Sequence, residues 1–249
     1  MHVLLPPSET KRSGGSSVFE LEDLAFPELT GRRRELRDAL VRLARDRDAS
    51  ARALKLGPRQ LSEIDRNAAL MTAPAMPAVD RFDGVLYDAL DAVGLGAAGR
   101  AHLGRTVLVQ SALWGPVRAS DPIPAYRLSH DSRVPGMPLK RWWAAEAGRA
   151  LASLSGLVLD LRSEAYAALG PLSGESRRFV RVRSRGVDGS LRNLNHFNKQ
   201  SKGLFVRALA EDGFATDSIE ELAAWSAGRG FELGVNAQSG ELDLVVPEA

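Results

Sequence analysis

The stretch Val3-Leu4-Leu5-Pro6-Pro7-Ser8-Glu9-Thr10-Lys11 changes from apolar to polar residues within a few positions. Its apolar start predicts a short buried strand, and the two prolines end that strand because proline cannot donate to a sheet ladder. Ser8, Glu9 and Lys11 follow at the carboxyl end of the strand, where ligands often bind in α/β sheets. The Ser8 hydroxyl and the Lys11 ammonium could hold a phosphate there. A polar turn with solvated charges accounts for the same residues.

A second apolar run, residues 157–161, leads in the same way into Arg162, Ser163 and Tyr166. Ser163 could cap the helix that follows. Helix N-termini present free N–H groups and a favourable dipole, so this segment is a candidate anion site. An ordinary cap beside a solvated arginine is the alternative interpretation.

The third candidate is the segment 198–207, which we predict to be helical from about residue 198 to residue 210. Lys199, Lys202 and Arg207 are then expected along one side of the helix, where aligned cations favour a phosphate partner. Gly203 costs about 1 kcal/mol against alanine inside a helix, which indicates close approach by a ligand or by a packed neighbour. A merely solvated face is the alternative.

A fourth candidate is the loop 120–128, which Pro122 and Pro124 stiffen. The prolines fix Tyr126 and Arg127 in a defined place. A tyrosine near an arginine can bind a base or a sugar. It can equally form a structural corner.

The remaining pattern predicts an α+β fold, with a mixed sheet and surrounding helices in one compact domain that spans residues 1–249. A β-branched run at 106–109 predicts a central strand. Residues 179–183 alternate with period two, and Asp188-Gly189 offers a hairpin turn before residues 191–197. A second hairpin is expected at 231–246, with its turn at Gln238-Ser239-Gly240. Strands and helices do not alternate as regular βαβ units.

The composition narrows the class of protein. The chain has 249 residues, of which 44% are hydrophobic and 26% charged, as in ordinary globular proteins. No run approaches the roughly 20 apolar residues of a membrane span, and the N-terminus lacks the basic start of a signal peptide. We therefore expect a cytoplasmic monomer without a membrane partner. The absence of cysteine excludes disulfides and thiolate chemistry, and the four histidines lack metal-ligand spacing, so we expect neither a metal site nor a cofactor.

Seven segments resemble, in the same order, segments of the YaaA family of bacterial peroxide-stress proteins. They are residues 4–11, 81–90, 112–118, 121–128, 160–166, 198–207 and 239–242. The resemblance implies a compact mixed fold with one positively charged cleft. It also implies protection from hydrogen peroxide, through limiting free intracellular iron and the DNA damage that iron drives, and DNA binding has been proposed for the family.

Carried over by position, the resemblance makes a set of polar residues the candidate lining of that cleft. They are Ser8, Lys11, Tyr126, Arg127, Arg162, Ser163, Tyr166, Lys199, Lys202 and Arg207. Three functions remain open, of which the third is an interaction protein whose cleft holds no small ligand. The cleft binds the phosphate backbone of DNA without reading bases, or it holds a nucleotide or other phosphorylated small molecule on which Ser8, Glu9 and Lys11 act, with Glu9 as general acid or base.

Overall fold

A computed structural model describes residues 1–185, 190–193 and 197–246. In chain order its helices and strands are β1 (His2–Leu5), α1 (Thr30–Leu43), α2 (Arg47–Leu54), α3 (Glu63–Ala68), β2 (Ala75–Pro77), α4 (Ala78–Arg81), α5 (Val85–Leu90), α6 (Ala97–Thr106), β3 (Val107–Ser111), β4 (Gly115–Arg118), β5 (Pro122–Pro124), α7 (Leu139–Ala152), β6 (Val158–Asp160), α8 (Glu164–Ala167), β7 (Arg177–Arg185), β8 (Leu191–Asn193), α9 (Asn198–Asp212), α10 (Ile219–Gly228), β9 (Glu232–Val235) and β10 (Leu242–Val246). Short 3-10 turns lie at Leu21–Asp23, Pro27–Leu29, Pro58–Gln60 and Ala92–Gly94.

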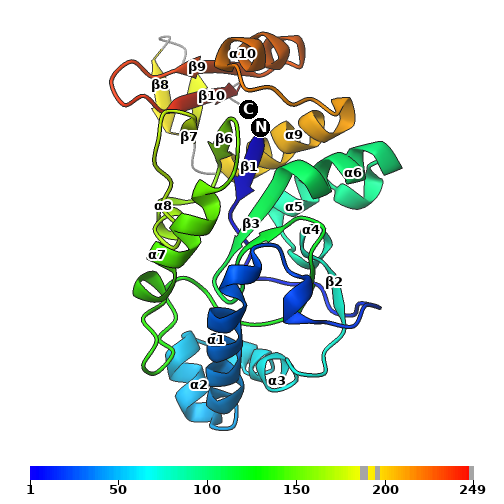
Figure 1. Cartoon of the computed structure of the whole chain (residues 1–249), viewed down its shortest axis with the longest axis vertical. Coiled ribbons are helices and arrows are strands. Elements are labelled where there is room, and N and C mark those ends of the chain that lie inside the picture. The colour runs from blue at the N-terminus through cyan, green and yellow to red at the C-terminus, as the bar shows by residue number, and fades with distance from the viewer. Residues whose placement is uncertain (186–189, 194–196, 247–249) are drawn as a thin grey trace.

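The centre of the fold is a mixed sheet with the strand order β4-β3-β1-β6-β7-β10-β9, and β8 pairs with β7 as well. The five strands from β3 to β10 run parallel, whereas β4 and β9 pair antiparallel at the two ends. Because β1 lies between β3 and β6, its carboxyl end and that of β6 reach the same edge of the sheet. The two strand ends that were expected to carry polar residues therefore lie side by side (Figure 1).

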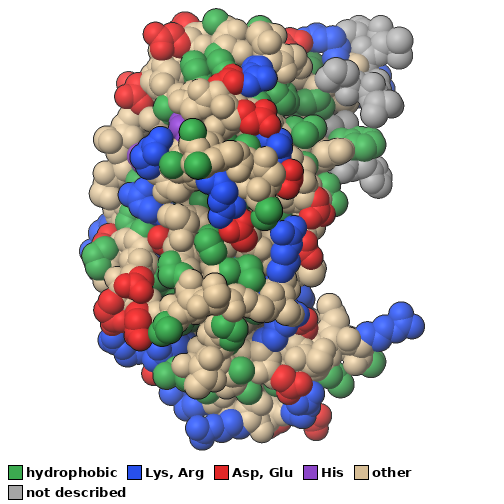
Figure 2. Space-filling view, turned by 90° about the vertical axis from the view of Figure 1, so that its right-hand side faces the viewer, with side chains coloured by type: hydrophobic (Ala, Val, Ile, Leu, Met, Phe, Trp, Pro, Cys, Tyr) green, Lys and Arg blue, Asp and Glu red, His purple; other side chains and the backbone are tan. Residues whose placement is uncertain are grey.

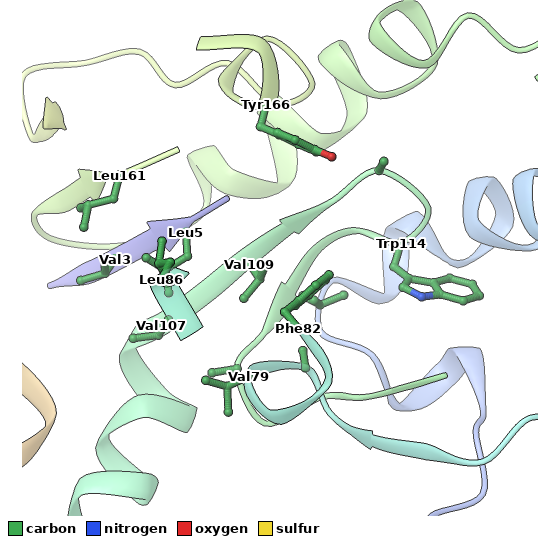
Figure 3. Close-up of a cluster of buried hydrophobic side chains, with 14 of the residues drawn as sticks. Val3, Leu5, Val79, Phe82, Leu86, Val107, Val109, Trp114, Leu161 and Tyr166 are labelled. Carbon is green, nitrogen blue, oxygen red and sulfur yellow. The ribbon is translucent and has the colours of Figure 1, made fainter. Parts of the chain in front are cut away.

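The two faces of the sheet bury alternate residues, as the period of a strand requires. Leu4, Leu108 and Val158 point to one face and pack against Leu151 and Leu154, in and just after α7. On the other face the odd-numbered residues of β1 and β3 join the main core, which includes residues of α5, α6 and α9 (Figure 3). The helices on the two sides of the sheet are visible in Figure 1. The result is a sheet covered by helices on both faces.

Helices α5 and α9 approach each other closely at Gly203. A Cβ atom added there would lie 2.2 Å from the carbonyl oxygen of Leu86 and 2.8 Å from the Cβ of Ala89. Only glycine permits this contact between the two helix backbones. Of the two explanations offered for Gly203 from the sequence, the packed neighbour is the one the structure shows.

The predicted α+β class and the predicted strands are confirmed. The final hairpin is present as antiparallel β9 and β10. Strands β7 and β8 also pair antiparallel, but the turn predicted at residues 188–189 lies outside the described residues. Within the loop 120–128 a short strand, β5, pairs with β2. None of the helices in the described part of the chain is both long and apolar enough to span a bilayer.

Candidate functional site

Two adjoining cavities open at the carboxyl ends of β1 and β6. The central cavity, of about 520 Å³, lies between residues 6–10 after β1, residues 83–87 at the start of α5, and the start of α9. The side cavity, also about 520 Å³, lies between residues 162–165, residues 179–182 of β7 and the same start of α9. Both are lined by Ser163, Asn198, Lys199 and Lys202. The first turn of α9 therefore forms a wall common to both spaces.

Lys202 is the buried cation of this wall. The residue is 7% exposed, and its ammonium forms no hydrogen bond or ion pair with any residue that the structure describes. The nearby carboxylate of Asp160 is already held at both oxygens by Arg162, at 2.8 and 2.7 Å. Burying a charge without a partner is costly. Burial accordingly lowers the pKa of Lys202 to about 8, and the carboxylate of Asp160 opposes this only in part.

This burial predicts a measurable dependence of stability on pH. The pKa of Lys202 is lower in the folded than in the unfolded state, so the unfolded state binds more protons between about pH 8 and 10.5. Wild-type stability should therefore rise with pH in that range. Lys202→Met removes the cost of burying the charged ammonium, so at pH 7 we expect the free energy of unfolding of the variant to exceed that of the wild type by roughly 2–3 kcal/mol. This difference should shrink as the pH rises toward 10.5.

Urea unfolding of both proteins at a series of pH values measures this difference. Lys140→Met, at an exposed position on α7, is the control and should give a difference that does not change with pH. A constant difference for Lys202→Met as well would contradict the burial of an unpaired ammonium.

The loop after β1 divides its polar residues between the cavity and the interior. Ser8 and Glu9 line the central cavity. Lys11 turns inward: it is 3% exposed, donates to the backbone oxygens of Ser8 (3.0 Å) and Glu9 (3.1 Å), and lies 4.1 Å from the ring centre of Tyr126. Burial, together with the charge of Arg127, lowers the pKa of Lys11 to about 7. Lys11 thus holds the loop in shape and is not among the residues that line the two cavities.

Tyr126 and Arg127 form the structural corner that was the second interpretation of their loop. The Tyr126 hydroxyl lies 2.6 Å from the Ser111 hydroxyl, and the whole side chain is buried. Arg127 makes an ion pair of 2.6 Å with Glu9, and its backbone exchanges two hydrogen bonds of 2.8 Å with the Asn67 side chain. Neither residue lines the two cavities. Arg127 acts on the site through Glu9.

The residues after β6 are also divided. Arg162 is fully buried and donates to Asp160, to the Gln110 side chain at 3.0 Å and to the Gly170 carbonyl at 2.9 Å. It borders the side cavity with all three guanidinium nitrogens occupied. Ser163 caps α8 by accepting from the Tyr166 amide at 3.4 Å, and it lines both cavities. Tyr166 lines the central cavity, where burial raises its pKa above the usual range.

The three cations of α9 do not share one side of the helix. Lys199 is exposed and lines both cavities beside Lys202. Arg207 instead binds the carbonyls of Leu90 (3.1 Å) and Asp91 (2.9 Å) at the end of α5 and pairs with Glu211. A spacing of five residues turns a helix by well over a quarter circle, which explains the separation of Lys202 from Arg207.

This chain resembles known proteins over nearly its whole length. The sequence profile of the family described as peroxide stress protein YaaA matches residues 1–235. The chain belongs to the YaaA family. A UPF0246 protein of Streptomyces coelicolor is 39% identical over 259 residues, covering 100% of this chain and 99% of that protein. A UPF0246 protein of Corynebacterium efficiens is 40% identical over 253 residues, covering 99% of this chain and 100% of the relative. The resemblance inferred from the seven segments is thereby confirmed.

Three further residues line the central cavity of this YaaA-family protein without having been singled out as site residues. Tyr87 donates from its hydroxyl to the Pro6 carbonyl at 2.8 Å and so ties α5 to the loop after β1. His130 packs edge-on against Tyr166, and its buried Nδ1 has no hydrogen-bond partner in the described structure. Asn198 is the first residue of α9. Tyr87 and Asn198 lay inside segments that carry the family resemblance, whereas nothing near His130 marked it.

Three arginines of β7 in this YaaA-family chain are paired with carboxylates. Along β7, Arg181 pairs with Glu164 and Glu241, Arg183 with Asp243, and Arg185 with Glu232. On the face drawn in Figure 2, basic and acidic side chains are interspersed rather than separated by sign. The positively charged cleft implied by the resemblance therefore stays a prediction, for which Lys199 and Lys202 are the strongest local support.

The described residues contain no group of three or more histidine, cysteine, aspartate or glutamate side chains placed to hold a metal ion. Glu9, the carboxylate at the central cavity after β1, is committed to Arg127. Asp83, the other carboxylate that lines this cavity, pairs with Arg12 at 3.3 Å, whereas Lys199 and Lys202 are the lysines of the wall.

Proposed function

We propose that this protein acts in the response to hydrogen peroxide, and helps limit iron-driven oxidative damage, by binding a small phosphate-bearing molecule in the central cavity. The peroxide role is the one that membership of the YaaA family supports. The observation that carries the binding mode is Lys202, a 7% exposed lysine on the wall of the cavity whose ammonium bonds to no residue in the described part of the chain. An anion there would supply a partner that the described residues do not provide.

The surroundings of Lys202 favour phosphate among anions. The cavity wall begins at the N-terminus of α9, a helix of 15 residues whose first N–H groups and dipole favour negative charge. Lys199 adds a second cation, and the hydroxyls of Ser8 and Ser163 add neutral hydrogen-bonding groups. The volume of about 520 Å³ exceeds that of inorganic phosphate and leaves room for a nucleoside or sugar.

The cavity also contains groups that could transform such a molecule. Glu9 lines it as a carboxylate that Arg127 orients at 2.6 Å, and such a positioned carboxylate could accept a proton as a general base. Ser8 lies next to it, and Lys11 fixes the loop that carries both. We therefore extend the proposal to catalysis: the protein would be an enzyme that acts on the bound phosphate compound, with Glu9 and Ser8 as the reacting groups.

Binding of duplex DNA is the second candidate, and the exposed position of Lys199 favours it. The pairing of the β7 arginines with carboxylates weighs against it, because a phosphate backbone would have to displace those carboxylates. A protein that neutralises several phosphates should show a slope of log binding constant against log salt of roughly 0.9 per phosphate.

One titration separates the two candidates. Fluorescent duplex DNA is titrated at several salt concentrations, while thermal unfolding is followed with a panel of nucleotides and sugar phosphates. We expect no DNA binding at moderate salt and a rise in the melting temperature with at least one phosphate compound, and this rise should be lost in Lys202→Met but kept in Lys140→Met. Strong, steeply salt-dependent DNA binding that requires Lys199 and Lys202 would overturn the small-molecule proposal in favour of DNA.

A further inference from the structure

Lys202 is one of five lysines in the chain, and its environment differs from that of the other four. Lys55 pairs with Asp131, whereas Lys140 and Lys199 are exposed. Lys11 is buried, but its ammonium is bound to two carbonyls beneath Phe82 and Tyr126, and it does not line either cavity. Lys202 alone among the five is both buried and in contact with a cavity large enough for a small molecule.

We propose that Lys202 is an amine nucleophile that forms an imine with an aldehyde or ketone carrying a phosphate or carboxylate group. The proposal rests on the anion site proposed above and adds a reaction to it. None of the described carboxylates binds the amine. Asp160 is the carboxylate that raises the pKa of Lys202, and both of its oxygens accept hydrogen bonds from Arg162. The neighbouring Lys199 and the start of α9 would hold the anionic group, which leaves Lys202 for the carbonyl carbon.

The protonation of Lys202 agrees with this role. With a pKa of about 8, roughly one molecule in ten carries the neutral amine at pH 7 in the absence of ligand. An ordinary exposed lysine is neutral at pH 7 in only about one molecule in 2500. A lysine desolvated next to other cations is a recognised form of activated amine. Lys11 has a still lower pKa, yet its amine has no access to a cavity, so the geometry decides between the two.

The apolar part of the central cavity supports the same chemistry. Pro6, Pro7, Val85 and Leu86 line it together with the polar residues. An apolar surround limits water near the amine and thereby favours the neutral form and the condensation product. The carbonyl compound would place its carbon chain or ring along these residues.

The step balances without an oxidant or a reductant. The lone pair of the neutral Lys202 amine adds to the carbonyl carbon, the π electrons of the carbonyl move to oxygen, and one proton passes from nitrogen to that oxygen to give a neutral carbinolamine. Loss of one water molecule, with one proton from nitrogen, forms the carbon–nitrogen double bond. Hydrolysis reverses the step and restores the lysine.

The test uses pyridoxal 5′-phosphate, which joins an aldehyde to a phosphate, as a chemical probe. The full chain is incubated with a small excess of the probe, reduced with cyanoborohydride, digested and mapped at all five lysines by mass spectrometry. We expect the adduct at Lys202 to exceed that at Lys55 and at Lys140 by at least about tenfold, and inorganic phosphate to suppress it. Pyridoxal, which lacks the phosphate, should give far less selectivity.

Two variants separate this inference from the binding proposal. Lys202→Arg keeps the charge but cannot form an imine, so it should still be stabilised by phosphate compounds while losing the adduct. Lys199→Arg should keep both the stabilisation by phosphate compounds and the adduct at Lys202. Labelling spread evenly over the surface lysines, or concentrated at Lys199, together with stabilisation by phosphate, would overturn the nucleophile and leave the anion site standing. If neither phosphate nor the probe raises the melting temperature and Lys202 is not labelled, both proposals fail.

Discussion

Replacing Asp160 by asparagine should lower the free energy of unfolding by about 3–5 kcal/mol, the range expected when a buried ion pair loses one charge. Arg162 has no exposed surface, and its guanidinium meets Asp160 through two nitrogens at 2.8 and 2.7 Å. The Arg162 amide donates to the same carboxylate at 3.1 Å. Asparagine keeps the shape of the side chain but leaves the buried guanidinium at the end of β6 without its countercharge.

Urea unfolding at pH 7 measures the loss. Glu22→Gln is the matched control, because it removes one charge from the Arg34–Glu22 pair, whose two side chains are 51% and 61% exposed. That pair should contribute less than about 1 kcal/mol. If Asp160→Asn lowers the free energy of unfolding no more than Glu22→Gln does, Arg162 is not held as a buried cation. The prediction that Arg162 binds a ligand would then be favoured again.

Arg162 also shows where sequence reasoning stops. The residues around it predicted a polar strand end, and β6 (Val158–Asp160) lies inside the predicted run 157–161. Whether Arg162 is solvated or buried depends on Gln110, which is 52 positions away and reaches it only because β3, β1 and β6 are neighbours. A single sequence contains no record of that pairing order. The same applies to Arg207, whose partners are the carbonyls at the end of α5.

The sequence predicted polar segments at strand ends that converge, and the structure brings them together because β1 and β6 are parallel neighbours and α9 begins beside them. Ser8 and Glu9 after β1, Ser163 and Tyr166 after β6, and Lys199 and Lys202 at the start of α9 all line the central cavity. The assignment of roles could not be predicted, since Lys11 and Lys202 have the same chemistry in the sequence. The difference between them is that two backbone carbonyls face Lys11 and none of the described groups bonds to Lys202.

The position of Lys202 depends on how closely α9 approaches α5, and Gly203 sets that distance. Gly203→Ala should destabilise the protein by about 3 kcal/mol or more, because the added carbon would lie 2.2 Å from the Leu86 carbonyl oxygen and 3.0 Å from the Leu90 amide nitrogen. Backbone atoms cannot rotate away as a side chain can, so the two helices must separate. The gain of up to about 1 kcal/mol in helix propensity is too small to offset this cost.

Chemical unfolding of Gly203→Ala and of Gly31→Ala tests the argument. Gly31 lies in α1, and an added Cβ would meet nothing within 4 Å, so this control should be neutral or stabilised by up to about 1 kcal/mol. Since a shift of α9 also moves Lys202, the stabilisation by phosphate compounds should weaken in Gly203→Ala and persist in Gly31→Ala. Equal stability of the two variants would show that α5 and α9 can move apart at little cost, and the cavity wall could then not hold Lys202 in a fixed place.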